Sequence, residues 1–342
     1  MAELPHGGFE VVSEVGQIAA SGHGPVALRA EAVLEALHRL VPFQAAVIYL
    51  LDPDRGAVMP VVSRGYGEAV YEYMISPANT EEIELLGFTR HRAALRLRDL
   101  PVPAERVRSW VEHVRPAGFR EGLGVGLFTP EGRHLGMLSL NTDTDRHPTE
   151  AARDLIGAIA PTIATAVDPT RSLAGMARII NPARAGILLT RAGNTLPVGG
   201  LPGHPLLDVG STVLAVATRQ LPTSGGYGSF LCPDTAHDAV TSHVRITVLA
   251  CPADSPQYVI AVVLLSPPGD LHGLTDRELA VLGLLVQGWP NRRIAAALFI
   301  TQRTVAAHVE HILPKLDTST RTLAAVRALR LGLYVPFPLV VM

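Results

Sequence analysis

One predicted helix, beginning near residue 302, carries small and polar side chains on its outer face. Six of them are of the types that contact phosphates or bases: Thr301, Arg303, Thr304, Ala306, Ala307 and Glu310. Free backbone N–H groups and the helix dipole favour phosphate at a helix start. Alanines let a backbone approach base edges, and a glutamate accepts a hydrogen bond from cytosine N4. The pattern therefore predicts a helix that enters the major groove of double-stranded DNA.

Other residues of chemically active types are better explained structurally. His308, Glu310 and His311 lie on differing faces of the same helix, and no further ligand is evident, so we predict no metal site. Cys232 and Cys251 lie near strand-like segments, which favours buried thiols over a redox sensor. A single disulfide between the two cysteines stays an open alternative.

Composition excludes several classes of enzyme. Lys315 is the only lysine among 29 basic residues, so the chain has no Walker A motif, and Schiff-base chemistry elsewhere in it is excluded. The glycine-alternating segment 122–126 lies inside a predicted strand, which argues against a phosphate-binding loop. No nucleophile elbow or pair of catalytic carboxylates stands out. We therefore expect no enzymatic activity, no catalytic residues and no cofactor.

The length of 342 residues allows two to three domains. Apolar runs fall short of the roughly 18 to 20 residues that span a bilayer, and the start lacks a signal sequence. We therefore expect a cytoplasmic protein with no membrane partner. Residues 271–335 carry eight basic and four acidic residues, whereas the whole chain has a formal net charge of −2. A basic C-terminal module on an acidic body indicates an anionic partner for that module.

The C-terminal sequence predicts four short helices, at 275–286, 291–298, 302–316 and 319–331. The first opens with a capping box, in which Thr275 and Glu278 bond to each other's backbone, and Thr301 is a natural N-cap for the third. The third helix has an apolar stripe at helical spacing: Val305, Val309, Ile312 and Leu316. This is the geometry of a helix-turn-helix, in which one helix packs and the next offers its outer face to DNA.

A known family shares this arrangement. The stretch LTDRELAVLGLLVQGWPNRRIAAALFITQRTVAAHVEHILPKL, followed by the arginine of TSTR, resembles the LuxR/NarL-type helix-turn-helix domain of bacterial transcription regulators. The resemblance implies a tetrahelical DNA-binding domain whose third helix enters the major groove and whose fourth often dimerises. We extend the predicted DNA interface to four more residues: Asn291, Arg292, Lys315 and Arg321.

Five positions depart from the family's pattern: Pro290, Ala306, Glu310, Pro314 and Asp317. Ala306 replaces a usual lysine, and a basic residue is common where Glu310 stands. Pro290 replaces a Ser/Thr cap, so that Asn291 is left to cap the second helix. Asp317 replaces a glycine, and Pro314 removes a backbone donor late in the third helix. Losing two contacts at 306 and 310 lowers DNA affinity and flattens its salt dependence.

The N-terminal body predicts a helix at 25–40, two hairpins, a variable middle and a long helix at 147–167. This order over residues 15–168 resembles a GAF-type sensory domain. Its signal is an unknown small molecule, for which Trp110, His113 and Arg115 are pocket candidates, although a plain helix is the favoured interpretation there. Residues 173–268 show strand-like segments at 185–190, 210–218, 244–251 and 258–266, and look like a small α/β module, PAS-like in type. The apolar tail PFPLVVM is expected to dock on the body or on a second chain.

The expected fold class is a multidomain α+β chain. It comprises a GAF-like sensory domain (1–168), a small α/β, PAS-like module (173–268) and an all-α tetrahelical helix-turn-helix domain (271–335). The expected function is a DNA-binding transcription regulator that acts as a homodimer, since two-fold operators need two recognition helices. RNA polymerase is a further expected partner. The alternative is a protein–protein interaction regulator whose degenerate helix-turn-helix grips DNA weakly.

Overall fold

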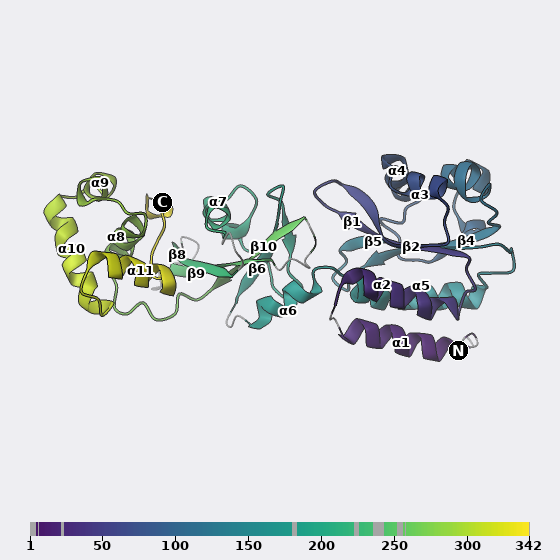
Figure 1. Cartoon of the computed structure of the whole chain (residues 1–342), viewed down its shortest axis with the longest axis horizontal. Coiled ribbons are helices and arrows are strands. Elements are labelled where there is room, and N and C mark those ends of the chain that lie inside the picture. The colour runs from purple at the N-terminus through teal and green to yellow at the C-terminus, as the bar shows by residue number, and fades with distance from the viewer. Residues whose placement is uncertain are drawn as a thin grey trace. The chain divides into compact units, whose positions relative to one another are not determined.

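The computed structural model describes residues 5, 7–21, 24–179, 183–221, 226–234, 243–251, 256 and 258–341. The chain divides into two compact units, Met1–Ser172 and Leu173–Met342 (Figure 1). Each unit is built on one five-stranded antiparallel sheet. In the described residues no helix is long and apolar enough to cross a bilayer.

The sheet of the first unit has the order β2-β1-β5-β4-β3. Its strands are β1 (Ala45–Asp52), β2 (Ala57–Arg64), β3 (Leu95–Arg96), β4 (Glu121–Phe128) and β5 (His134–Thr142). Both predicted hairpins are confirmed, as β1–β2 and β4–β5. The glycine-rich sequence of β4 has a steric reason, because a Cβ on Gly126 would lie 2.2 Å from the carbonyl oxygen of Phe88. The segment 122–126 is therefore a buried strand.

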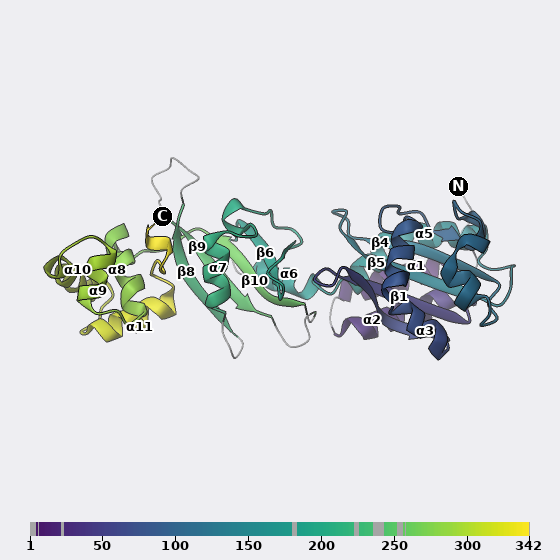
Figure 2. The same ribbon diagram turned by 90° about the horizontal axis from the view of Figure 1, so that it is seen from above.

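Helices cover both faces of this first sheet (Figure 2). One face packs against α2 (Val26–His38) and α5 (Glu150–Val167), and α1 (Gly8–Ser21) packs on the outer side of these two helices. The other face packs against α3 (Glu68–Met74) and α4 (Pro77–Leu85). Short turns of helix fill the segment before β4, namely η1 (Leu97–Asp99), η2 (Ala104–Arg106) and the π-helix η3 (Ser109–Val114). This is the α/β architecture expected of the N-terminal body.

The sheet of the second unit has the order β7-β6-β10-β9-β8, which repeats the connectivity of the first. Its strands are β6 (Ala185–Thr190), β7 (Thr195–Pro197), β8 (Tyr227–Pro233), β9 (His243–Ala250) and β10 (Val259–Ser266). A helix, α6 (Arg171–Ile179), precedes the sheet, and η4 (Pro205–Leu207) and α7 (Thr212–Arg219) lie between β7 and β8. The common order agrees with two related α/β modules.

The strand expected at 210–218 is wrong, because that segment forms α7. Ser211 caps the helix by accepting a hydrogen bond from the amide of Leu214 at 3.1 Å. Val213, Val216 and Ala217 then face the core at helical spacing. A run of Val, Leu, Ala and Thr is compatible with the repeat of a strand and with that of a helix. The N-cap and the burial of one side favour the helix.

Four helices follow the second sheet, as the sequence predicts: α8 (Asp276–Val286), α9 (Asn291–Ala297), α10 (Gln302–Lys315) and α11 (Arg321–Leu331). A last turn, η5 (Leu339–Val341), lies in the apolar tail. The buried residues of the four helices join those of one face of the second sheet in a single apolar cluster. The C-terminal helices are therefore packed on the second α/β module.

Candidate nucleic-acid interface

Side-chain caps fix where the C-terminal helices begin. The capping box of α8 is confirmed, since the Thr275 hydroxyl accepts from the Glu278 amide and Glu278 Oε2 accepts from the Thr275 amide at 2.7 Å. The N-cap of α10 is confirmed as well, with Thr301 Oγ1 accepting from the amide of Thr304 at 3.1 Å. The hydroxyls of Thr301 and Thr304 lie 2.8 Å apart at the same helix start. Two hydroxyls and the unpaired amides of the first turn thus form a polar edge at the N-terminus of α10.

The two faces of α10 differ as the sequence predicts. Val305, Ile312 and Leu316 are buried, and Val309 packs half-buried against the same cluster. On the outer face the side chains of Arg303 and Glu310 are exposed. Ala306 and Ala307 are half-buried there. A small and polar outer face of this kind lets the helix backbone approach another surface closely.

Lys315 is engaged inside the domain. Its Nζ donates to both carboxylate oxygens of Glu278, at 2.7 and 3.0 Å. The Glu278 side chain is 4% exposed and that of Lys315 31%. Burial raises the pKa of Glu278, but hydrogen bonds from Lys315 and Thr275 outweigh it and leave the pKa below its usual value. The ion pair ties the end of α10 to the start of α8.

Arg321, the first residue of α11, bonds to α9 and to the connection that precedes it. Its guanidinium donates to Oδ1 of Asn291 at 3.0 Å and to the carbonyl oxygen of Trp289 at 2.9 Å. The expectation that Asn291 caps α9 is wrong, because Pro290 occupies the N-cap position without a side-chain cap bond. Asn291 is the first helical residue instead, and its amide oxygen receives Arg321. Of the ten predicted interface residues, Asn291, Lys315 and Arg321 therefore have partners within the bundle.

Two cations of the predicted interface are unengaged. The guanidinium groups of Arg292 and Arg303 are exposed, and neither pairs with any residue that the structure describes. Arg293, which the sequence reasoning passed over, lies over the ring of Trp289 at 3.8 Å. The signal that could have indicated this contact is the spacing of four residues between the tryptophan and the second arginine of GWPNRR. Arg292 and Arg303 are thus free to meet a polyanion, while Arg293 is held on an aromatic face.

Two turns around α10 have a left-handed backbone. Phe299, between α9 and α10, has a φ of 53°, and Asp317, after α10, has a φ of 48°. The second value explains why the family has a glycine where this chain has Asp317, since glycine adopts that conformation without strain. The Phe299 side chain is 91% exposed and lies directly before the polar start of α10.

The first unit holds a small interior hollow of about 80 Å³ between its sheet, α3 and α4. Three tyrosines lie on its wall: Tyr49, Tyr66 and Tyr73. Tyr66 donates to Asn141 at 2.6 Å, and Tyr73 donates to Glu82 at 3.2 Å. Burial raises the pKa of all three phenols. The hollow is therefore lined by neutral phenols and apolar side chains, together with the Glu82 carboxyl and the amides of Asn79 and Asn141.

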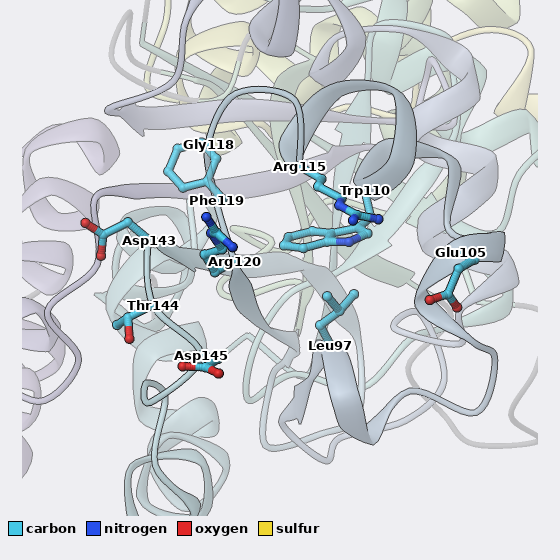
Figure 3. A pocket seen from close by; sticks show the side chains of 10 residues that line it. All are labelled: Leu97, Glu105, Trp110, Arg115, Gly118, Phe119, Arg120, Asp143, Thr144 and Asp145. Atoms are coloured by element: carbon cyan, nitrogen blue, oxygen red, sulfur yellow. The ribbon is translucent and has the colours of Figure 1, made fainter.

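A second, open hollow of about 800 Å³ lies at the surface of the first unit (Figure 3). Buried Trp110 and Phe119 form the apolar part of its lining, and exposed Arg115 and Arg120 line it as well. Of the residues named as pocket candidates from the sequence, Trp110 and Arg115 line this hollow. His113 does not line it, because its ring stacks on Tyr73 at 4.3 Å.

The remaining candidates are placed as follows. No disulfide joins Cys232 and Cys251, and Cys232 is buried whereas Cys251 is half-buried. Burial raises the pKa of Cys232 to about 12. His308 is half-buried and His311 exposed on α10. No group of three or more His, Cys, Asp or Glu side chains able to hold a metal ion occurs among the described residues.

Comparison with known proteins identifies two of the parts. Residues 272–328 match the family described as bacterial regulatory proteins, luxR family, and residues 29–168 match the GAF domain. The resemblances stated from the sequence are thereby confirmed. The chain carries a GAF domain in its first unit and a LuxR-type helix-turn-helix domain in its second.

Several curated proteins are similar over part of this chain. The transcriptional regulatory protein DegU of Brevibacillus brevis is 32% identical over 39% of this chain and 54% of its own length. LiaR of Bacillus subtilis is 53% identical over 17% of this chain and 28% of its own length. The nitrate/nitrite response regulator NarL of Escherichia coli K12 is 47% identical over 17% and 26%. This chain therefore spans about half of DegU and about a quarter of the other two.

Proposed function

We propose that the protein is a transcription regulator that binds double-stranded DNA through its C-terminal domain. The unpaired guanidinium groups of Arg292 and Arg303, beside the small outer face of α10, carry this proposal. The names of the similar proteins, all regulators of transcription or response regulators, support it.

In this proposal the outer face of α10 lies in the major groove. Arg303, Thr301 and Thr304 meet phosphates at the helix start, together with Arg292 from α9. Ala306 and Ala307 allow close approach and apolar contact with a thymine methyl, and Glu310 accepts from cytosine N4. Asn291, Lys315 and Arg321 act as positioning residues, because their hydrogen bonds tie α10 to α8 and α11 to α9.

We further propose that the protein binds DNA as a homodimer through α11. The outer side of this helix exposes Leu323, Val326 and Leu329, which are 51%, 41% and 52% exposed. Leu323 and Val326 line an open groove of about 890 Å³ that also includes Pro314. Pairing two copies along α11 covers this apolar side and presents two recognition helices to two half-sites. RNA polymerase is a further partner in this proposal, and the protein acts in the cytoplasm.

The GAF domain is proposed to supply the signal by binding a small molecule. A ligand shifts the regulator between states only if it binds those states unequally. The tyrosine-lined hollow offers hydroxyl and apolar contacts. Its volume of about 80 Å³ admits only a small chemical group, and a larger ligand requires α3 or α4 to move.

Salt dependence tests the DNA proposal. With Arg292 and Arg303 as the phosphate contacts, a dimer neutralises four phosphates, and the slope of log K against log salt is about −3.6. Arg303→Ala removes two contacts and brings the slope to about −1.8. Arg120→Ala, an exposed and unpaired arginine of the GAF domain, is the matched control and leaves the slope unchanged. If Arg303→Ala and the parent protein showed the same slope of log K against log salt, Arg303 would not contact the DNA, which would contradict the proposal.

A further inference from the structure

The chain continues beyond the family domain in a segment that the domain itself does not require. The family match ends at residue 328, whereas α11 ends at Leu331 and buried apolar residues follow it: Leu333, Tyr334, Val335 and Leu339. We call residues 332–341 the strap. All four of these side chains are at most 3% exposed, so the strap is packed at these positions, whereas Phe337 between them is 39% exposed.

The strap bridges the second sheet and the DNA-binding domain. On one side the amide of Leu231, in edge strand β8, donates to the carbonyl oxygen of Tyr334 at 2.8 Å. On the other side the amide of Val335 donates to the carbonyl oxygen of Leu279, in α8, at 3.3 Å. The Tyr334 hydroxyl donates to Gln220 Oε1, just after α7, at 3.0 Å. The neighbouring residues Tyr334 and Val335 thus bond to the second sheet and to the DNA-binding domain, respectively.

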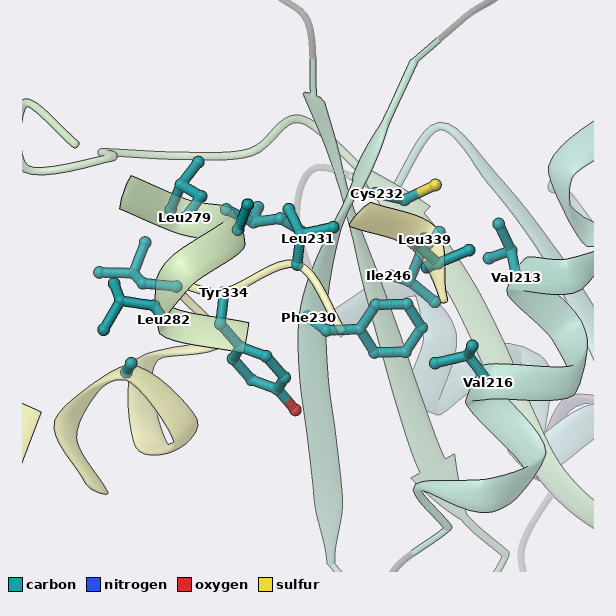
Figure 4. Packing of buried hydrophobic residues seen from close by; sticks show 14 of the residues in the cluster. Val213, Val216, Phe230, Leu231, Cys232, Ile246, Leu279, Leu282, Tyr334 and Leu339 are labelled. Carbon is teal, nitrogen blue, oxygen red and sulfur yellow. The ribbon is translucent and has the colours of Figure 1, made fainter. Parts of the chain in front are cut away.

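Leu339 anchors the far end of the strap. It is fully buried in the cluster that contains Phe230, Ile246 and Val213 of the second α/β module (Figure 4). Figure 4 also shows Tyr334 between Leu282 of α8 and Phe230 of β8. The cradle that holds Leu339 is therefore made by the sheet and α7, whereas the segment that fills it comes from the end of the chain.

A single arginine of the second sheet bonds both to the connection that precedes the DNA-binding domain and to the end of that domain's last helix. Arg245, in β9, donates through Nη2 to the carbonyl oxygen of Pro268 at 2.8 Å, in the connection that leads into α8. Its Nη1 donates to the carbonyl oxygen of Leu331 at 2.7 Å, where α11 ends. Burial lowers the pKa of this guanidinium, and its hydrogen bonds join three segments far apart in sequence.

Two glycines make room for the strap. A Cβ on Gly283, in the middle of α8, would lie 1.8 Å from the carbonyl oxygen of Val335. A Cβ on Gly332, whose φ is 63°, would lie 2.1 Å from Ser229 Oγ. A glycine inside a helix is disfavoured relative to alanine, so the close approach of the strap supplies a reason for Gly283.

We propose that the strap is a built-in lock, by which the second α/β module holds the DNA-binding domain in one orientation. The docked state leaves Arg303 and Glu310 of α10 exposed, together with Leu323 of α11. The lock therefore sets the direction in which the recognition helix points and does not mask it. A change in the second module that opens the cradle around Leu339 frees the domain to move on its linker.

Hydrogen exchange of full-length variants tests the lock without DNA, so its outcome is independent of the DNA proposal. Gly283→Ala drives a methyl group into the strap, and Leu339→Asn removes the apolar anchor while leaving the family domain unaltered. We expect the amides of Leu231 and Val335 to exchange at least about thirtyfold faster in both variants, the factor for losing a buried leucine. The matched control is Gly16→Ala in α1, where a Cβ meets nothing within 4 Å.

The amides of β10 next to β6, such as Val263 and Leu265, give the internal reference. The proposal requires them to keep their parent rates in both variants, because undocking leaves the second sheet folded. Unchanged exchange at Leu231 and Val335 would overturn the proposal. Equal acceleration at Val263 would overturn it too, since the strap would then be an inseparable part of the sheet's core.

Discussion

Replacing Lys315 by methionine distinguishes a lysine that holds the bundle together from one that contacts DNA. Its Nζ lies 2.7 and 3.0 Å from the Glu278 carboxylate, whose side chain is 4% exposed. Removing one partner of a buried ion pair costs about 3–5 kcal/mol. Because Lys315 is 31% exposed, we expect the free energy of opening of α8 to fall by about 2–3 kcal/mol, below that range.

The pH dependence of this loss has a definite sign. With Lys315 present the pKa of Glu278 is lowered, so the pair stabilises the folded state above about pH 4.3 and the contribution is lost as the pH falls. Without Lys315 the burial of Glu278 opposes its ionisation, and the variant is penalised most near neutral pH. The difference between the variant and the parent protein therefore shrinks as the pH approaches 4.

Native-state hydrogen exchange at the α8 amides measures the opening free energy within the full chain. The double variant Glu278→Gln with Lys315→Met is the control, and it should be more stable than Lys315→Met alone because no buried charge is left unpaired. The salt slope of DNA binding should be unchanged. A stability loss below about 0.5 kcal/mol, or a slope that falls by about 1.8 per dimer, would refute the structural role.

Three further expectations follow from single residues. Asp317→Gly should raise the free energy of unfolding by roughly 1 kcal/mol, because the left-handed φ of 48° strains an aspartate and not a glycine. Thermal unfolding should therefore show a higher melting temperature for the variant, and a lower one would contradict this reasoning. Ala306→Lys should tighten DNA binding and steepen the salt slope by about 0.9 per subunit in an anisotropy titration, and an unaltered slope would argue against α10 in the groove. Cys232, with its pKa raised to about 12, should resist iodoacetamide at pH 8 until urea is added, as peptide mass spectrometry can check; alkylation of the folded protein at the rate of a free thiol would show that it is accessible.

Local signals in the sequence were enough to predict where α8 and α10 begin and which face of α10 is buried. Thr275 and Thr301 cap α8 and α10 as expected, because a cap needs only a hydroxyl and a nearby amide. The apolar stripe from Val305 to Leu316 was sufficient to orient α10, since one face of the helix had to be buried. The hairpins of the first sheet were similarly predictable from strand-like apolar and glycine-rich runs on either side of short turns.

Contacts between segments that are distant in the chain could not be predicted from the sequence. Lys315 and Glu278 are 37 residues apart, and Arg321 and Asn291 are 30 apart, so their pairing depends on how the helices pack. The sequence analysis therefore placed Lys315 and Arg321 in the DNA interface, whereas packing gives each an internal partner. Strand β8 was missed because its sequence, YGSFLCP, mixes glycine and serine with few β-branched residues.

The sequence left two docking surfaces open for the apolar tail, the body of the protein or a second chain. The structure places Leu339 in the core of the second module, and the tail's first contacts depend on Arg245, Leu231 and Leu279. Each of these lies more than 50 residues earlier in the chain. Only the folded sheet and the folded bundle together create the surface on which the tail packs.

The central claim is that the C-terminal domain selects DNA through α10. The most direct measurement incubates the full-length protein with random duplex DNA at several salt concentrations and sequences what is retained. We expect a two-fold motif with half-sites about one helical turn apart, retained less well as salt rises. Failure of the folded protein to select any sequence at low salt would contradict the claim. A helix-turn-helix that binds a protein partner would then be the better account.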